Sequence, residues 1–264
     1  MPGIFTISPV NSLSFVRSNT LLPSFDNTLY QNLQRVVSKV PYCQMIQVQD
    51  TITLQVKTDF TSVAASIYNV ATGAMTSLTP TIASTYTNYS FWNIPVTFST
   101  LGYFKIFVSG TLSGYSPVTY NSEMIEVRSS WDGVLLNYYN SVNTIYVDYS
   151  TGIQHQIRAF GFVKFSDVGG TDEYYNNFGV EERVYAENQT IYELYLEGIP
   201  YYLCKQIIYG SKLDNFYINN VPYLVTEHTV TVQSGSHNYD LVLKMMQQNV
   251  TGINNDFQSN IQLS

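Results

Sequence analysis

Hydrophobic and polar residues alternate along most of the chain between residues 42 and 128, and turn-forming residues interrupt the alternation at short intervals. A period of two places successive side chains on opposite faces, as in a half-buried β-strand. Seven short strands in a block of this length are typical of an immunoglobulin-like β-sandwich. The predicted strands are Ile46–Gln49, Thr51–Lys57, Val63–Val70, Tyr86–Trp92, Ile94–Phe98, Gly102–Val108 and Met124–Val127.

A second block, residues 129–249, follows the polar stretch Arg128–Ser130 and is again predicted to be mainly β. Its one predicted helix covers Tyr201–Tyr209, because Pro200 precedes it and Gly210 lies just past its end. Asn219 and Asn220 predict a tight hairpin, since asparagine tolerates left-handed backbone conformations. The predicted strands are Val142–Tyr149, Gln154–Val163, Glu181–Ala186, Thr190–Leu196, Asn215–Ile218, Tyr223–Glu227 and Asp240–Met245.

Residues 1–41 follow neither pattern and are predicted to form an N-terminal arm. Within it, the apolar residues of Leu29–Val37 recur at helical spacing and predict one short helix. The arm either docks on another protein or packs locally, and the sequence leaves both open. Residues 250–264 are polar and are expected to form a tail. The expected fold is therefore mainly β, with two tandem sandwiches, residues 42–128 and 129–249, between an arm and a tail.

The composition points to contact with other proteins. Only 12% of the 264 residues are charged, whereas 23 are Tyr and 14 are Phe. A surface of phenols, amides and hydroxyls packs closely against neighbours, because fewer charged groups must lose water. The net charge of −7 argues against direct nucleic-acid binding. The apolar runs are too short to cross a membrane, and the N-terminal residues carry no secretory signal, so we expect folding in a cytoplasm.

Candidate catalytic and metal-binding residues are few, and we predict no enzyme, no cofactor and no metal site. Cys43 and Cys204 lack the spacing of a zinc site or a redox pair and are expected to be reduced and mostly buried. The three histidines, His155, His228 and His237, lie on separate segments without a ligand partner. His155 is expected at the surface beside the glutamines of its strand.

The stretch Asp167–Glu173 reads as a long, glycine-kinked loop with three carboxylates. Carboxylates in a loop could bind calcium, but the spacing is not that of an EF-hand, and the sequence leaves this open. Asp172 and Glu173 are also the only candidates for a glycosidase acid pair. Asn88, Asn188 and Asn249 begin glycosylation patterns, which are expected by chance in a chain rich in Asn, Ser and Thr.

Aromatic residues occur as consecutive pairs. In a strand, neighbouring residues point to opposite faces, so one ring of each pair is expected to face outward. Outward rings could stack on sugars, but burial at a subunit interface is favoured because no cluster of amides or charges marks a sugar platform. The pairs are Tyr138–Tyr139, Tyr174–Tyr175, Tyr201–Tyr202 and Phe216–Tyr217.

Several stretches resemble structural proteins of tailed phages that infect Bacteroidetes, including the crAss-like phages. They are Gly198–Pro200 with the following helix, Asn215–Tyr223, Tyr103–Val108 and Ser122–Val127. The resemblance implies a virion subunit of the tail, collar or neck, copied around a symmetry axis as a ring and assembled in the host cytoplasm. Its partners would be copies of itself and other tail or neck proteins.

The sequence thus predicts a non-enzymatic, ring-forming virion protein. The alternative is a glycan-binding β-sandwich module of a phage fibre or cell-surface adhesin.

Overall fold

The computed structural model describes residues 4–8, 10–18, 42–111, 117–177, 180–233 and 238–248; for Ser18 and residues 168–189 it describes the backbone alone. Within these residues the chain is mainly β, with one α-helix and one 3-10 turn, so the predicted fold class is confirmed at that level. The predicted helix at Leu29–Val37 and the predicted tail from residue 250 lie outside the described residues.

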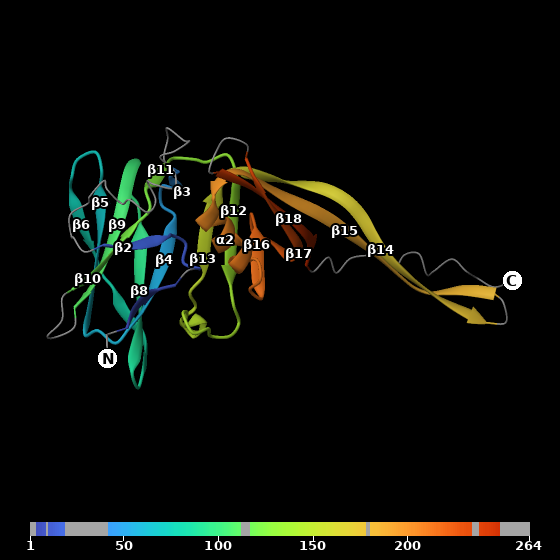
Figure 1. The fold of residues 1–264 in the computed structure, drawn as a ribbon, viewed down its shortest axis with the longest axis horizontal. Coiled ribbons are helices and arrows are strands. Elements are labelled where there is room, and N and C mark those ends of the chain that lie inside the picture. The colour runs from blue at the N-terminus through green and yellow to red at the C-terminus, as the bar shows by residue number, and fades with distance from the viewer. Residues whose placement is uncertain are drawn as a thin grey trace.

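Strands β1 to β11 build the first part of the molecule (Figure 1). Strands β1, β4, β8 and β7 form a four-stranded sheet in that order, while β2, β3, β5, β6, β9, β10 and β11 belong to a larger sheet. Leu54 and Ile94 of the small sheet share one buried core with Ile106 and Ile125 of the larger one. The bounds are β1 Phe5–Ile7, β2 Phe15–Ser18, β3 Gln44–Gln47, β4 Thr51–Thr58, β5 Ser62–Asn69, β6 Met75–Leu78, β7 Thr81–Tyr86, β8 Tyr89–Thr97, β9 Gly102–Thr111, β10 Val118–Ser122 and β11 Ile125–Arg128.

The second part encloses its own core. Here the larger sheet continues in the order β13, β12, β16, β17, β18, β15 and β14, and helix α2 packs against it. Leu136 of β12, Leu194 of β15 and Leu241 of β18 are fully buried together with Leu203 and Ile207 of α2. The bounds are β12 Val134–Tyr139, η1 Tyr149–Thr151, β13 His155–Ala159, β14 Gly161–Asn177, β15 Val180–Pro200, α2 Tyr201–Gly210, β16 Asn215–Ile218, β17 Val221–Val232 and β18 Asn238–Gln247.

One backbone pair joins the two parts of the larger sheet. Arg158 of β13 pairs with Met45 of β3. The Arg158 guanidinium also donates to both carboxylate oxygens of Asp50, at 2.6 and 3.0 Å. A bidentate ion pair of this kind fixes geometry as well as charge, so it holds the two parts in register.

The described part of the predicted N-terminal arm packs locally. β1 pairs with β4 and β2 pairs with β10, so both strands extend sheets of the first part. Between them, Asn11 is fully buried, and its side chain exchanges two hydrogen bonds with the backbone of Gln55, at 3.1 and 3.2 Å. The carbonyl of Val10 accepts from the phenol of Tyr138 in the second core, at 3.0 Å. Residues 10–14 therefore lie between the two cores and touch both.

Several predicted elements are confirmed. Helix α2 covers the predicted stretch, and Asn219 and Asn220 take positive φ angles of 50° and 66° at the hairpin between β16 and β17. Other bounds differ, because local alternation does not show where pairing stops. The predicted Ile94–Phe98 strand is the second half of β8, and Glu181–Ala186 and Thr190–Leu196 merge into β15. Strands β1, β2, β6, β7, β10 and β12 were not predicted.

The predicted strand Val142–Tyr149 is wrong. This stretch is a loop that leads into the turn η1. The hydroxyl of Thr144 accepts from the backbone N–H of Val147 at 3.1 Å, and the Asp148 carboxylate accepts from the N–H of Ser150 at 3.1 Å. Side chains that satisfy the local backbone in this way compete with strand pairing, so the alternating apolar residues do not form a ladder.

Strands β14 and β15 form a ribbon that extends far from the rest of the molecule (Figure 1). The two strands pair with each other from Gly161 opposite Leu196 to Asn177 opposite Val180. The next strand, β18, pairs with β15 only from Ile191 to Pro200. The distal half of the ribbon is therefore two strands wide.

Candidate functional site

His155 is buried, and its predicted surface position is wrong. It is fully enclosed, and neither ring nitrogen has a hydrogen-bond partner among the described residues. The rings of Tyr138 and Tyr149 pack against it at 5.5 and 5.8 Å. Burial lowers its pKa to about 3, so the imidazole is neutral. The alternation of β13 carries the missed signal, because Ile157 and Ala159 share the inward face of His155.

His228, the other histidine among the described residues, does not join it in a site. His228 is exposed on β17, and His237 lies outside the described residues. Among the described residues there is no cluster of three His, Cys, Asp or Glu side chains that could hold a metal ion.

The predicted acidic loop, Asp167–Glu173, is part of strand β14, so the loop prediction is wrong. A strand rises about 3.3 Å per residue, which separates the backbones of Asp167 and Asp172 by roughly 16 Å. Asp172 and Glu173 are consecutive strand residues, and neighbouring positions of a strand lie on opposite faces, so the extended backbone does not bring the three acidic positions together. The two glycines that suggested a loop, Gly169 and Gly170, instead pair with Gln189 and Asn188 of β15, because a glycine-containing stretch can also form a strand.

The two thiols lie in places that disfavour reactivity. Cys204 is buried in helix α2 and Cys43 is half-buried, and neither forms a disulfide. Burial raises the pKa of Cys43 to about 11 and that of Cys204 to about 12. Since the thiolate is the reactive form, both remain thiols at neutral pH.

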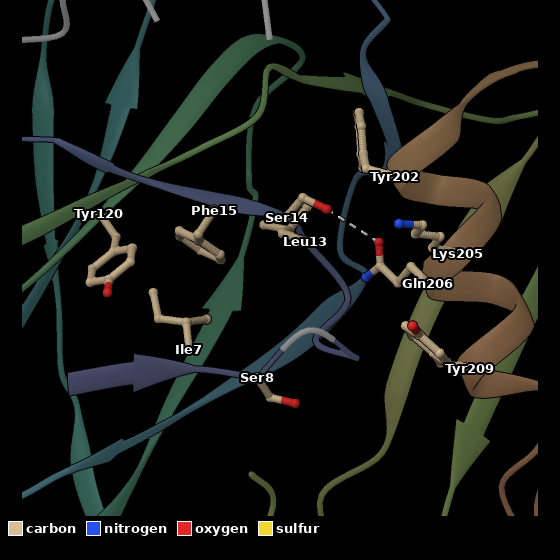
Figure 2. A pocket seen from close by; sticks show the side chains of 10 residues that line it. All are labelled: Ile7, Ser8, Leu13, Ser14, Phe15, Tyr120, Tyr202, Lys205, Gln206 and Tyr209. Atoms are coloured by element: carbon tan, nitrogen blue, oxygen red, sulfur yellow. Dashed lines mark hydrogen bonds between the residues drawn. The ribbon is translucent and has the colours of Figure 1, made fainter. Parts of the chain in front are cut away.

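A cavity of about 310 Å³ lies between the N-terminal segment and helix α2. Figure 2 shows Ile7, Leu13 and Phe15 on one side and the α2 side chains on the other. The hydroxyl of Ser14 lies 3.4 Å from the amide oxygen of Gln206 and donates to it across the gap. The lining side chains carry no carboxylate or imidazole. The remaining lining residues are Ser8, Tyr120, Tyr202, Lys205 and Tyr209.

Beside this cavity, Glu123 is a buried carboxyl group that joins three segments. Its Oε1 accepts from the backbone N–H of Ser14 at 3.0 Å, and its Oε2 accepts from the phenol of Tyr202 on α2. Burial raises the Glu123 pKa to about 7, although the two hydrogen bonds act in the opposite direction. The Glu123 carboxyl group has a structural role, because its hydrogen bonds connect helix α2 to the first part of the molecule.

Two groups of exposed hydrophobic side chains lie at opposite ends of strand β12. The aromatic patch lies at the Val134 end of β12 and consists of the exposed Phe160 and Phe162 with the half-buried Trp131 and Tyr195. In it, Phe162 is 52% exposed and stacks on Tyr195 with a centroid distance of 5.3 Å. The ring of Phe160 meets that of Trp131 at 5.4 Å. Exposed groups of large apolar side chains mark contact surfaces more often than single ones do.

The loop patch follows β12 and comprises Tyr86, Val142, Ile145 and Tyr146. Val142 is 64% exposed and Ile145 is 68% exposed. The loop is held in place from below, because the ammonium of Lys57 donates to the carbonyl of Ile145 at 3.0 Å. Its apolar side chains are therefore presented to solvent on a fixed backbone.

The prediction that one ring of each consecutive aromatic pair faces outward is confirmed for two pairs. Tyr138 and Phe216 are buried, while their neighbours Tyr139 and Tyr217 are half-buried and stack on each other at 6.1 Å. In the third pair Tyr201 is exposed and Tyr202 is half-buried, but both lie on helix α2, where the alternation of a strand does not apply. The side chains of Tyr174 and Tyr175 lie outside the described ones.

Comparisons of the chain with protein-family models, curated proteins and solved structures find no match. Within the part of the chain that the structure describes, no helix combines the length and the apolar character that a membrane crossing requires.

Proposed function

We propose that this protein is a non-enzymatic structural subunit of a virion, a ring-forming component of a phage tail, collar or neck. The β14–β15 ribbon carries the proposal. An isolated pair of strands is marginally stable in water, because too little surface is buried between them. A chain that sends such a ribbon away from its own core gains stability where the ribbon lies against another protein.

The two exposed patches support contacts between copies. The aromatic patch and the loop patch lie at opposite ends of β12, and their side chains differ. A contact that joins two different patches is heterologous, and repeated around an axis it closes into a ring. The patches also fit the phenol-rich, charge-poor composition of the chain.

The finer architecture belongs to the same proposal. We propose that residues 42–128 and 129–249 are tandem sandwich domains, the first immunoglobulin-like. In support, one buried core uses residues 5 to 127 and the other uses residues 134 to 245. Sandwiches of this kind expose edge strands that can pair with a neighbour.

The virion assignment is supported by the resemblance of Gly198–Pro200 and Asn215–Tyr223 to structural proteins of tailed phages. The direct test is mass photometry and negative-stain microscopy of the purified protein over a wide range of concentrations. We expect closed oligomers whose population rises with concentration. A protein that stays monomeric throughout, and is absent from purified particles by mass spectrometry, contradicts the proposal.

One observation favours the second candidate, a glycan-binding module. The exposed ring of Phe162 lies flat on Tyr195, with 11° between their planes, and the Lys164–Glu193 ion pair lies on the same strands. Flat rings beside polar groups can hold a sugar. A glycan array separates the candidates, because a glycan module gives hits that Phe162→Ala abolishes, whereas an assembly subunit gives none.

A further inference from the structure

We infer that the cavity between residues 7–15 and helix α2 is a binding site for a small apolar carboxylate, of the chemical class of a medium-chain fatty acid. The site does not depend on the proposed assembly role, because the described residues that line it are separate from the aromatic patch and the loop patch.

The walls of the cavity are held in place by hydrogen bonds within the chain. On the N-terminal side, the backbone N–H of Ser14 donates to the Glu123 carboxyl group at 3.0 Å. On the α2 side, the amide nitrogen of Gln206 donates to the carbonyl of Asn11, and its amide oxygen accepts from the hydroxyl of Ser14 at 3.4 Å. The cavity is therefore preformed, as most small-molecule sites are.

The volume of the cavity suits a molecule of moderate size. It measures about 310 Å³, which is at the lower end of the range of ligand sites. A water molecule occupies about 30 Å³ in the liquid, so the space equals that of about ten waters. Octanoate is a carboxylate of this size.

The side of the cavity formed by the N-terminal segment is apolar (Figure 2). Ile7, Leu13 and Phe15 line it, together with Tyr120 of β10. The phenol of Tyr120 already donates to the carbonyl of Phe5 at 3.1 Å, so Tyr120 offers its ring to the cavity. A hydrocarbon chain that lies against these side chains leaves water without breaking their hydrogen bonds.

The α2 side of the cavity supplies a positive charge. Lys205 is the charged residue among the described residues of the lining. Its ammonium lies 4.6 Å from the centre of the Tyr201 ring, and the described structure places no carboxylate within ion-pair distance of it. An ammonium beside an apolar wall favours a ligand with a hydrocarbon body and an anionic end.

The buried carboxyl group beside the cavity does not oppose an anion at mildly acidic pH. Burial raises the pKa of Glu123 to about 7, so this group is mostly protonated at pH 6. The carboxyl group of a fatty acid in water is similar to that of an exposed glutamate and is ionised at this pH. Binding at pH 6 therefore reports the attraction to Lys205.

The test titrates three ligands with the same hydrocarbon chain into the full-length protein at pH 6, and calorimetry measures the binding. Octanoate has a negative end, octanol has no charge and octylammonium has a positive end. We expect octanoate to bind with a dissociation constant on the order of 0.1 to 1 mM, as is usual for so small a ligand. Octanol should bind more weakly and octylammonium should not bind. Absence of octanoate binding, or equal affinities for octanoate and octylammonium, overturns the inference.

Substitution Lys205→Met tests the charge, since methionine keeps most of the length of the side chain and removes the ammonium. The variant should bind octanoate about fivefold more weakly and octanol as native protein does. The matched control is Lys212→Met, an exposed lysine just beyond α2 and outside the described lining, which should bind both ligands like native protein. The same loss of octanoate affinity in both variants contradicts a role for Lys205.

Substitution Ile7→Trp tests the location, because the larger ring fills the cavity from its apolar side. A folded variant, checked by circular dichroism and thermal unfolding, should bind neither octanoate nor octanol. Octanoate binding that survives in it would show that the ligand lies on another apolar surface, and the inference then fails. Because Lys205 is exposed, Lys205→Met keeps the test decisive if Ile7→Trp does not fold.

Discussion

The phenol of Tyr202, on helix α2, donates a hydrogen bond to the buried carboxyl group of Glu123, which lies between strands β10 and β11. The backbone N–H of Ser14 donates to the other carboxyl oxygen. One ionisable group thus connects the N-terminal segment, the first core and the second core. Its protonation should therefore be visible in the stability of the whole chain.

Substitution Glu123→Gln should remove one component of the pH dependence of unfolding. Burial raises the folded-state pKa of Glu123 from 4.5 to about 7. The folded protein holds this proton more tightly than the unfolded chain, so stability falls as pH rises from 4.5 to 7 and is level above it. The loss amounts to about 3 kcal/mol. Urea unfolding of native protein and variant at several pH values measures it.

The difference between the two proteins is the informative quantity. We expect Glu123→Gln to be the more stable protein at pH 8, because the amide carries no charge and the Tyr202 phenol can rotate to accept from it. The exposed Glu197→Gln serves as control and should track native protein. A difference that does not change between pH 4.5 and 7.5 would show that Glu123 is not buried as a single titrating group.

Substitution His155→Phe should change the pH dependence of unfolding in the opposite direction. The His155 pKa falls from 6.5 to about 3 on folding, so the unfolded chain takes up the proton first. Native stability is therefore lost as pH falls from 6.5 towards 3, by up to about 5 kcal/mol. Phenylalanine keeps the ring between Tyr138 and Tyr149 and removes two nitrogens without hydrogen-bond partners.

Acid titration followed by circular dichroism checks this prediction. The variant should stay folded to a lower pH than native protein, whereas the exposed His228→Phe should not differ. Between pH 4.5 and 6.5 the effects of Glu123 and His155 have opposite signs and partly cancel. A flat native profile there, with sloped profiles in the two single variants, is the expected pattern.

Asn11→Ala should destabilise the junction of the two cores. The Asn11 side chain satisfies both the N–H and the carbonyl of Gln55 in a fully buried place. Two buried backbone groups without partners cost roughly 2–4 kcal/mol. Equilibrium unfolding measures the loss, and Asn140→Ala, in a more exposed loop, should change the free energy by less than about 1 kcal/mol. Equal effects would mean that residues 10–14 do not lie between the cores.

The two exposed patches can be tested by mixing variants. Ile145→Ser weakens the loop patch and Phe162→Ser weakens the aromatic patch, and each alone should abolish oligomers while changing the unfolding free energy by less than about 1 kcal/mol. In a head-to-tail contact, a mixture of the two variants restores one intact junction and should yield dimers in mass photometry. A mixture that remains monomeric contradicts a contact between these two patches.

The local patterns predict some elements well and others poorly. Helix α2 was predictable because proline, glycine and apolar spacing all lie within a dozen residues. The Asn219–Asn220 hairpin was predictable because its backbone angles depend on two residues. The stretch Val142–Tyr149 alternates like a strand, but the Thr144 and Asp148 side chains satisfy its backbone instead. For His155 the inward periodicity was present, and the neighbouring glutamines were the misleading signal.

The sequence by itself determined the mainly β class, the helix after Pro200, the scarcity of charge and the accumulation of acidic residues in one stretch, because each is a property of composition or of near neighbours. Only the tertiary structure decided that this acidic stretch is a projecting ribbon and that Asn11 lies between two cores. It also decided that Glu123 meets Tyr202. These features depend on contacts between residues far apart in the chain. Such contacts are stabilised by the burial of apolar surface that both segments share, and the local periodicity of one segment does not show which segment it will contact.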